Sequence, residues 1–247
     1  MSGATRALAW GPQGHRVAGA LTWAYLSADA QRAVTTILGD QTLADASVWA
    51  DRMRGNPSPF WQETAGAYHY VTVPPGKLYR DIGAPAQGDG VTALAQFAGT
   101  LNDPASAMVE KQLALRFGLH IVQDLHQPLH VGNGQDRGGT RYTVNLRGET
   151  TNLHRIWDSS ILEAGNRSDR GWIRRLHMSA PEAKDHWQAD PLIWIAESAA
   201  LRDRIYPKRT SLDEEYLMIW LPEVEQRLAQ AAVRGAAWIE SVLLPAE

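Results

Sequence analysis

The chain has 247 residues, of which 44% are hydrophobic and 21% are charged, and these values exclude a disordered chain, a collagen and a coiled-coil rod. It has no cysteine, which excludes disulfide scaffolds, cysteine-ligated zinc fingers, iron–sulfur clusters and thiol nucleophiles. The formal net charge is −3, so no overall positive field attracts nucleic acid, and the sequence lacks the apolar run of about 18 residues that a membrane span needs.

The first nine residues have one feature of an export signal and lack another. Ala7-Leu8-Ala9 has the form of a signal-peptidase site, but no apolar core precedes it. Either the sequence begins inside a longer precursor or its leader has been replaced, and an N-terminal tag is the alternative. We expect residues 1–9 to be a remnant of a leader or a tag, and residues 10–247 to form a single domain.

Helical periodicity dominates the rest of the chain and predicts a mainly α class. The expected helices span residues 21–26, 28–38, 43–53, 105–127, 190–206 and 212–242. Ser27 and Gly39 are expected to cap the second of these, and Asp103-Pro104 to open the fourth. Pro222 is expected to start a new helix or to kink the last one.

Two stretches are expected to be extended instead. They are residues 68–73 and residues 141–146, and the second follows a turn at Gly138-Gly139.

Histidine and aspartate recur at a spacing that suits metal binding. His120 and Asp124 are four residues apart and therefore share one helix face, and His154 and Asp158 repeat this spacing. An imidazole and a carboxylate one turn apart can bind a single zinc ion. One such pair is more often a surface pair or a buried hydrogen bond, but two pairs with His130 between them favour a metal site.

Three further candidates lie upstream, and a competing use of His and Asp is weaker. The upstream residues are His15, Asp51 and His69. A serine hydrolase would need a Gly-x-Ser-x-Gly elbow, which the sequence lacks, and no glycine motif for cradling phosphate is present either.

Five segments in this order are specific enough to identify a family resemblance. The segments are Trp10–His15, Trp49–Asp51, Tyr68–Val71, His120–His130 and Asn152–Asp158. From Trp10 to its C-terminal helices, the chain resembles the trinuclear-zinc, single-strand-specific nucleases of moulds and plants. This resemblance implies a mainly α, single-domain phospholipase C/nuclease-like fold with a short β-hairpin, so that residues 10–247 would be one zinc nuclease domain.

The resemblance also implies three Zn²⁺ ions per chain, each with its own set of ligands. The implied ligands of the first ion are Asp51, His69, His120 and Asp124. Those of the second are the α-amine and carbonyl oxygen of Trp10, with His15 and the shared Asp124. Those of the third are His130, His154 and Asp158. His126 is expected to support or pack rather than to bind metal, and His177 and His186 to be surface residues.

These ligands suit hydrolysis of a phosphodiester. Two metals that share a carboxylate can activate water for in-line attack on phosphorus, and a third can neutralise the phosphate. Three Zn²⁺ and three aspartates leave a local charge of about +3, so the net charge of −3 does not argue against an anionic substrate. The expected catalytic residues are Asp51, Asp124 and Arg54. Arg54 lies where the family carries a basic residue near the phosphate; the alternative is an exposed arginine at a helix end.

The resemblance places substrate-binding residues beside the ligands. Tyr70 matches an aromatic residue that stacks on an unpaired base, which would explain a preference for single strands; the alternative is a strand residue that faces the core. Thr72 and Thr140 depart from the family, which often has an acidic or amide residue at the first position and asparagine at the second. Both departures indicate a changed or weaker base preference.

The expected function is therefore zinc-dependent hydrolysis of single-stranded DNA and RNA at the P–O3′ bond, giving 5′-phosphorylated products, with 3′-nucleotidase activity. Nucleic acid and nucleotides are the expected partners, and we expect a monomer without a protein partner. Export to the periplasm or medium of a bacterium is expected, because fungal members carry disulfides that this chain lacks. Cleavage after Ala9 would free the Trp10 amine, whose pKa of about 7.7–8.0 lets zinc displace its proton.

Two alternatives remain at this point. A zinc phospholipase C would have a longer spacing than that between Trp10 and His15, and a glutamate in place of Asp158. A zinc- or nucleic-acid-binding protein without catalysis is the other alternative, and the complete ligand set argues against it.

Overall fold

The computed structural model describes residues 10–244, so the leader or tag expected at residues 1–9 lies outside the described part. The helices are α1 (Pro12–Tyr25), α2 (Ala28–Leu38), α3 (Leu43–Ser47), α4 (Trp49–Arg52), α5 (Tyr79–Ile82), α6 (Gly90–Asn102), α7 (Met108–Asp124), α8 (Leu153–Arg155), α9 (Ile161–Ala164), α10 (Asp169–Leu176), α11 (Ala180–His186), α12 (Pro191–Ile205) and α13 (Glu214–Leu243). Short 3₁₀ or π turns are η1 (Met53–Gly55), η2 (Phe60–Thr64), η3 (Ala65–His69), η4 (Pro128–His130) and η5 (Ile156–Ser160). The strands are β1 (Val71–Thr72), β2 (Val131–Gly132), β3 (Thr143–Leu146), β4 (Glu149–Asn152) and β5 (Ser211–Leu212).

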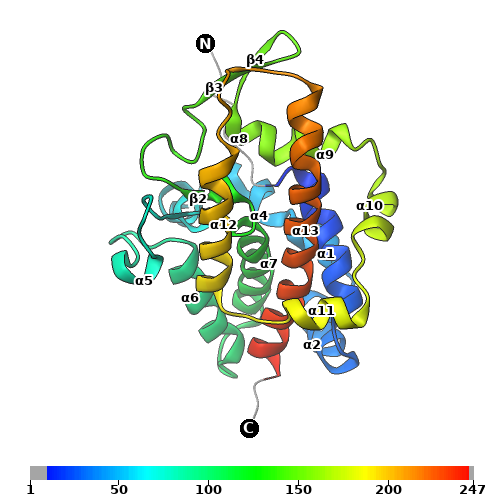
Figure 1. The fold of residues 1–247 in the computed structure, drawn as a ribbon. Helices are drawn as coiled ribbons and strands as arrows, with labels where there is room; N and C mark the ends of the chain where they lie inside the picture. Colours follow the sequence, from blue (N-terminus) through cyan, green and yellow to red (C-terminus); the bar gives the residue numbers. More distant parts are fainter. Residues whose placement is uncertain (1–9, 245–247) are drawn as a thin grey trace.

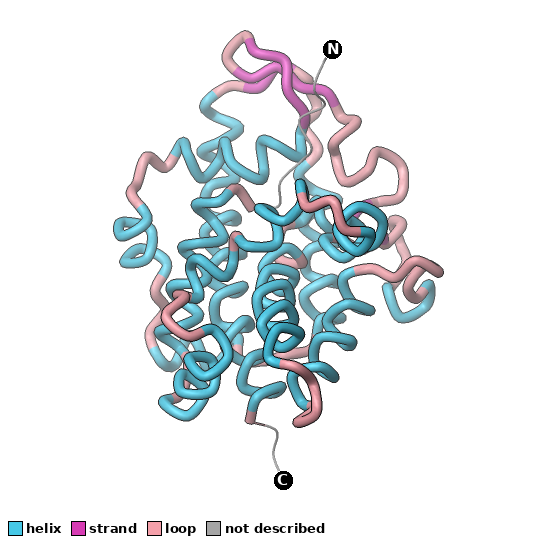
Figure 2. The backbone as a smooth tube through the Cα atoms, turned by 180° about the vertical axis from the view of Figure 1, so that it is seen from behind, coloured by secondary structure: helices cyan, strands magenta, loops and turns pink. Residues whose placement is uncertain are grey.

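The expected mainly α fold with a short hairpin is confirmed. The long helices α7 and α13 lie side by side near the middle of the molecule, and α13 also packs along α1 (Figure 1). The hairpin β3–β4 lies at the end of the molecule opposite the C-terminus, whereas helix occupies most of the remainder (Figure 2). Strand β5 extends this hairpin in parallel with β3, and β1 pairs in parallel with β2. Within residues 10–244, no helix combines the length and the apolar character needed to cross a membrane.

Several predicted helix ends are confirmed by their caps. Ser27 accepts a hydrogen bond from the Ala30 amide at the start of α2, and Gly39 ends that helix with φ +61°. The Asp190 side chain likewise accepts from the Leu192 amide at the start of α12.

The start predicted for the central helix is wrong. Asp103 ends α6, because its amide donates to the Gly99 carbonyl. Its carboxylate accepts from the Ala105 amide in a turn, and α7 begins only after Ala107. The predicted end at residue 127 is also too late, since α7 stops at Asp124 and a turn follows before Pro128.

Three other predicted boundaries also change. The helix expected over residues 43–53 is broken at Val48, whose ψ of 0° separates α3 from α4. Pro222 lies inside α13 and does not start a new helix. In the segment expected to be extended at residues 68–73, Tyr68 and His69 end the 3₁₀ turn η3, Tyr70 is extended and β1 is strand. The other extended segment becomes a strand from Thr143.

Two groups of buried apolar side chains form the core. One lies among α2, α6, α7 and the segment before β1 and includes Phe117 and Ile121. The other joins α1, the hairpin, α9 and the first half of α13, and it includes Trp10, Trp157 and Trp172. The candidate metal ligands come from segments on both sides of the junction between these two groups.

Candidate metal centre

The fold brings together all eight His and Asp side chains that the sequence analysis assigned to metal ions. Three groups have ligand atoms within 4.8 Å of one another: His15, His120 and Asp124; Asp51, His69 and His120; and His130, His154 and Asp158. Seven of these eight side chains are buried, and Asp51 is nearly so.

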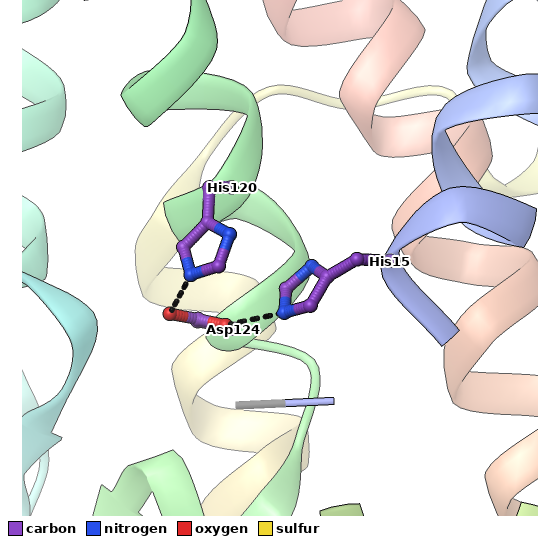
Figure 3. A group of neighbouring side chains, drawn as sticks. All are labelled: His15, His120 and Asp124. Atoms are coloured by element: carbon purple, nitrogen blue, oxygen red, sulfur yellow. Dashed lines mark ion pairs between the residues drawn. The ribbon is translucent and has the colours of Figure 1, made fainter. Parts of the chain in front are cut away.

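Asp124 lies at the middle of this arrangement, at the last turn of α7. Its Oδ1 is 3.4 Å from His15 Nε2, and its Oδ2 is 2.9 Å from His69 Nδ1 and 3.2 Å from His120 Nε2. Figure 3 shows His15 reaching this carboxylate from α1 while His120 reaches it from one turn earlier on α7. The carboxylate therefore joins helices that are far apart in the sequence.

Four of the five histidines have Nδ1 held beside an oxygen atom. In each, Nδ1 lies 2.6 Å from that oxygen, and the pairs are His15 with Gln123 Oε1, His120 with the Ser47 carbonyl, His130 with the His69 carbonyl and His154 with the Gly138 carbonyl. A neutral imidazole that donates from Nδ1 keeps a lone pair on Nε2. This is the arrangement by which proteins orient metal-binding histidines.

Buried polar atoms in the centre lack hydrogen-bond partners. Within residues 10–244, His15 Nε2, His130 Nε2 and Asp124 Oδ1 are buried and accept no hydrogen bond. Such atoms each cost about 1–3 kcal/mol unless something else satisfies them. Lone pairs of nitrogen and carboxylate oxygen that converge in this way fit a cation with mixed N/O preference, such as zinc.

The electrostatics of the third group also fit a cation. Burial raises the pKa of Asp158 well above its ordinary value, despite a 2.6 Å hydrogen bond from Gln127 Nε2. Burial lowers the pKa of His154 to about 3. A neutral imidazole is the form that binds metal, and a divalent ion beside Asp158 would hold that carboxylate ionised.

Comparison with known proteins agrees with this geometry. The sequence model described as S1/P1 nuclease matches residues 10–244, which includes every residue of the three groups. The chain belongs to the S1/P1 nuclease family.

Fungal and plant relatives cover nearly the whole chain. Nuclease S1 of Aspergillus oryzae is 31% identical over 283 aligned positions, which cover 98% of this chain and 96% of that protein. Endonuclease 2 of Arabidopsis thaliana is 30% identical, with 94% of this chain and 90% of that protein covered. Nuclease P1 of Penicillium citrinum is 24% identical, with 94% and 97% covered. Membership in the S1/P1 family and these relatives support a nuclease, a hydrolase that acts on nucleic acids.

Two hydrogen bonds hold the N-terminal part of this S1/P1 family member against the candidate metal centre. Trp10 is buried, and its indole Nε1 donates to the Gln123 carbonyl at 2.9 Å. The amide of Gly11 donates to the Asp158 carbonyl at 2.6 Å. The backbone of Trp10 is therefore held between the segments that carry Asp124 and Asp158.

The expected phosphate and base contacts lie at the edge of the centre. Arg54, on η1, places Nη2 2.8 Å from Asp51 Oδ1, so it pairs with a candidate ligand and does not extend into solvent from a helix end. Burial alone would raise the pKa of Asp51, but His120 and Arg54 outweigh it and hold this pKa below its ordinary value. Tyr70 is 47% exposed, so it does not face the core. It lines a pocket of about 390 Å³ together with Thr72, Gln87 and Gly88.

The Thr140 hydroxyl forms a hydrogen bond within its own turn. Thr140 is partly buried, and its hydroxyl donates to the Arg137 carbonyl at 3.1 Å. The two glycines before it form a close turn, with φ values of +59° and +77°, and a side chain at Gly138 would collide with the Leu129 carbonyl.

His126, His177 and His186 belong to none of the metal groups found in residues 10–244. His126 is buried and neutral: burial lowers its pKa well below the ordinary value, Nδ1 donates to the Val122 carbonyl at 2.7 Å, and Nε2 faces Arg234. The sequence analysis missed Gln123, Gln127 and Ser47, which orient His15, Asp158 and His120. The only sequence signal for the two glutamines is their position beside ligands.

Proposed function

We propose that this S1/P1 nuclease is a zinc-dependent phosphodiesterase that hydrolyses single-stranded DNA and RNA at the P–O3′ bond and leaves 5′-phosphorylated products. It also removes 3′-phosphates from nucleotides. The observation that carries the proposal is the set of three buried His/Asp groups, two of which share His120, around Asp124. The relatives named nuclease and endonuclease support the same class of substrate.

The proposed zinc ligands are those implied by the family resemblance. The first ion would be held by Asp51, His69, His120 and Asp124; the second by Trp10, His15 and Asp124; and the third by His130, His154 and Asp158. Zinc would supply Lewis-acid charge at the phosphate and lower the pKa of the attacking water.

The protein's own groups prepare the site for this reaction. The Nδ1 hydrogen bonds hold four imidazole lone pairs in place before a substrate arrives, which avoids reorganisation during the reaction. The carboxylate of Asp124 would balance charge at the first and second metal positions. That of Asp51, which pairs with Arg54, would do so at the first position only. Arg54 would donate charge-assisted hydrogen bonds to the phosphate oxygens.

The pocket at Tyr70 gives the proposed preference for single strands. An exposed aromatic ring can stack on any unpaired base, but a base inside a duplex is already stacked on both faces. Thr72 on the pocket wall offers one short hydroxyl to a base edge. The Thr140 hydroxyl would have to leave the Arg137 carbonyl to offer another. Short hydroxyls that both donate and accept discriminate weakly between bases, so we propose a relaxed base preference.

The remaining proposals concern the mature protein. Residues 10–247 would form one zinc nuclease domain that acts as a monomer after export, and cleavage after Ala9 would complete the second site with the Trp10 amine. The bonds from Trp10 and Gly11 to the segments of Asp124 and Asp158 support this role for the N-terminus.

One set of assays tests the proposed function. Turnover is measured on single-stranded DNA, duplex DNA and phosphatidylcholine, each before and after chelation and again after zinc is restored. We expect rapid hydrolysis of single strands only, its loss with chelator and its return with zinc. Hydrolysis of phosphatidylcholine alone would indicate a phospholipase, and zinc binding without turnover would indicate a binding protein.

A further inference from the structure

Three exposed arginines lie beside the third metal group. None of them belongs to the candidate metal ligands or lines the Tyr70 pocket. Arg137 directly precedes Gly138, whose carbonyl accepts from His154 Nδ1 at 2.6 Å, and Arg155 directly follows His154. Arg141 follows the same turn, and its amide donates to the Asp136 carbonyl at 3.0 Å. We call Arg137, Arg141 and Arg155 the arginine rim.

The positive charge of this rim is not neutralised by a carboxylate. Among residues 10–244, no acidic side chain forms an ion pair with any of the three. The acid nearest in sequence to Arg137 and Arg141 is Asp136, and it is occupied elsewhere: Oδ1 accepts from the Gly139 amide at 2.9 Å and Oδ2 accepts from Tyr206 at 2.7 Å. The rim is therefore available to an anion from solution.

The backbone at Arg137 adds an independent observation. Its φ is +55°, a conformation that glycine or asparagine adopts more easily than arginine. Arg147 has a similar φ of +54°, but its side chain forms an ion pair with Glu214. Among residues 10–244, Arg137 forms no such pair, and its side chain is exposed.

The position of the rim fits one strand of nucleic acid. Strands β1 and β2 pair through Val71 with Val131 and through Thr72 with Gly132, and Gly132 in turn faces Gly138. The Tyr70 pocket, the strand pair, the Gly138 turn and His154 are therefore neighbours in the fold. A strand with one base at Tyr70 and its scissile phosphate at the metal centre would continue toward the rim.

We propose that the arginine rim binds the backbone phosphates that flank the scissile phosphate in a single strand. This proposal rests on the proposed nuclease function and adds a subsite to it. Guanidinium groups make charge-assisted hydrogen bonds to phosphate, and such contacts position a strand without reading its bases. The rim favours long strands over dinucleotides, which have no flanking phosphate.

The test compares kcat/KM for a dinucleotide, dTpdT, and for a twelve-residue oligo(dT) in the triple variant R137A/R141A/R155A. Each phosphate contact on a single strand contributes about 0.7 to the slope of log affinity against log salt concentration, so three contacts contribute about 2. That slope corresponds to an approximately 20-fold fall between 50 and 200 mM salt. We expect the slope for the oligonucleotide to be about 2 units shallower in the variant, and the ratio of oligonucleotide to dinucleotide kcat/KM to fall about tenfold or more at low salt.

A matched control removes the same charge elsewhere. The variant R170A/R174A/K184A also loses three exposed cations without a described ion pair, and they lie on α10 and α11. It should retain the wild-type ratio and slope. Equal effects in both triple variants, or no effect in either, would overturn the proposal.

Binding of phosphorothioate oligo(dT), measured by fluorescence anisotropy, separates this subsite from the proposed function. If wild-type protein cleaves neither substrate, the proposed function fails, yet the rim still predicts weaker and less salt-dependent binding by the R137A/R141A/R155A variant. If wild-type protein cleaves both substrates and the variant binds as tightly as wild type, the nuclease function stands and the subsite is wrong.

Discussion

Asp124 is the residue on which two of the proposed metal positions depend. Its carboxylate is buried and lies within 3.4 Å of imidazole nitrogens of His15, His69 and His120. We predict that Asp124→Ala lowers kcat/KM by more than about 100-fold, the upper range for loss of an outer partner of a metal ligand. Metal analysis should show that more than one ion is lost.

Two comparison variants make this prediction specific. Gln123→Ala removes the acceptor that orients His15, and we expect a loss of about 10- to 100-fold. Asp40→Ala removes an exposed carboxylate and should behave as wild type. A full complement of zinc in folded Asp124→Ala protein would show that Asp124 is not a shared ligand.

Tyr70 tests the proposed base contact without disturbing the metals. Tyr70→Ala should weaken substrate binding by about 1–3 kcal/mol, because the ring that stacks on the base is lost, while the zinc content stays unchanged. Tyr70→Phe keeps the ring and should be nearly silent. Steady-state kinetics on a short single strand, with metal analysis of each variant, is the measurement; unaltered kinetics in Tyr70→Ala would refute stacking.

The candidate metal ligands could be predicted from sequence, whereas the residues that orient them could not. His120 with Asp124 and His154 with Asp158 have a helical spacing that is visible in a single sequence. The Ser47 carbonyl that fixes His120 lies 73 residues away in sequence, and Gln127 meets Asp158 across 31 residues. Contacts of this range depend on how the helices pack, and no local pattern encodes them.

The turn before β3 is the connecting segment on which the third metal group depends most. The Gly138 carbonyl holds His154, φ is +59°, and an added Cβ would meet the Leu129 carbonyl. We predict that Gly138→Ala lowers activity more than tenfold and reduces zinc binding, because the turn must move away from His154.

Gly148 provides the matched control for this change. Its φ is +87°, but an added Cβ would meet nothing within 4 Å. Gly148→Ala should therefore lose only roughly 1–2 kcal/mol of stability, from backbone strain, and should keep its activity. Activity and zinc content that change equally in both variants would show that backbone strain alone explains the effect.

A network of ion pairs and hydrogen bonds connects α12 and α13 with the segment that follows Asp124. Arg227 donates to the His126 carbonyl at 3.1 Å and to Glu197 at 2.6 Å, and Arg234 also pairs with Glu197. Glu197→Gln should cost about 2 kcal/mol of unfolding free energy at neutral pH, less than the loss of a fully buried partner because the side chain is 37% exposed. Urea unfolding of both proteins at several pH values measures the difference.

The sign of the pH effect follows from the pKa of Glu197. Burial alone would raise it, but the charges and hydrogen bonds of Arg234 and Arg227 lower it below the ordinary 4.5. A depressed folded-state pKa stabilises the protein above the unfolded value and loses this contribution as pH falls through the folded value. The difference in unfolding free energy between wild type and Glu197→Gln should therefore become smaller below about pH 4.5. Glu163→Gln, at an exposed residue, should not change the unfolding free energy. An effect of Glu197→Gln on the unfolding free energy that does not depend on pH would contradict the ion-pair explanation.

The helices α2, α7, α12 and α13 were predictable from sequence, whereas α6 and the first part of α1 were not expected. The ends of the predicted helices depended on competition between neighbouring elements. Asp103 has the features of an N-cap, yet it closes α6 and leaves α7 to begin after Ala107. Proline usually breaks a helix, but α13 continues through Pro222 and packs against α1 and α7. At Asp103 local hydrogen bonds to Gly99 and Ala105 set the helix end, whereas at Pro222 tertiary packing overrode local propensity.

At the scale of the whole molecule, the proposed zinc ions lie between the two apolar groups of the core. Asp51, His69 and His120 adjoin residues of the first group, whereas His154 and Asp158 adjoin residues of the second. His130 lies between Val131 of the first group and Leu129 of the second. His15 extends from α1 to Asp124 and joins the two sides. Composition predicted none of this, because a net charge of −3 describes the whole chain and not the site.

The content of zinc in active protein tests the central claim most directly. Elemental analysis of purified, active protein that begins at Trp10 should give about three zinc ions per chain, one for each group of ligands. A ratio of one or less in protein that is fully active and has not met a chelator would contradict the three-ion centre.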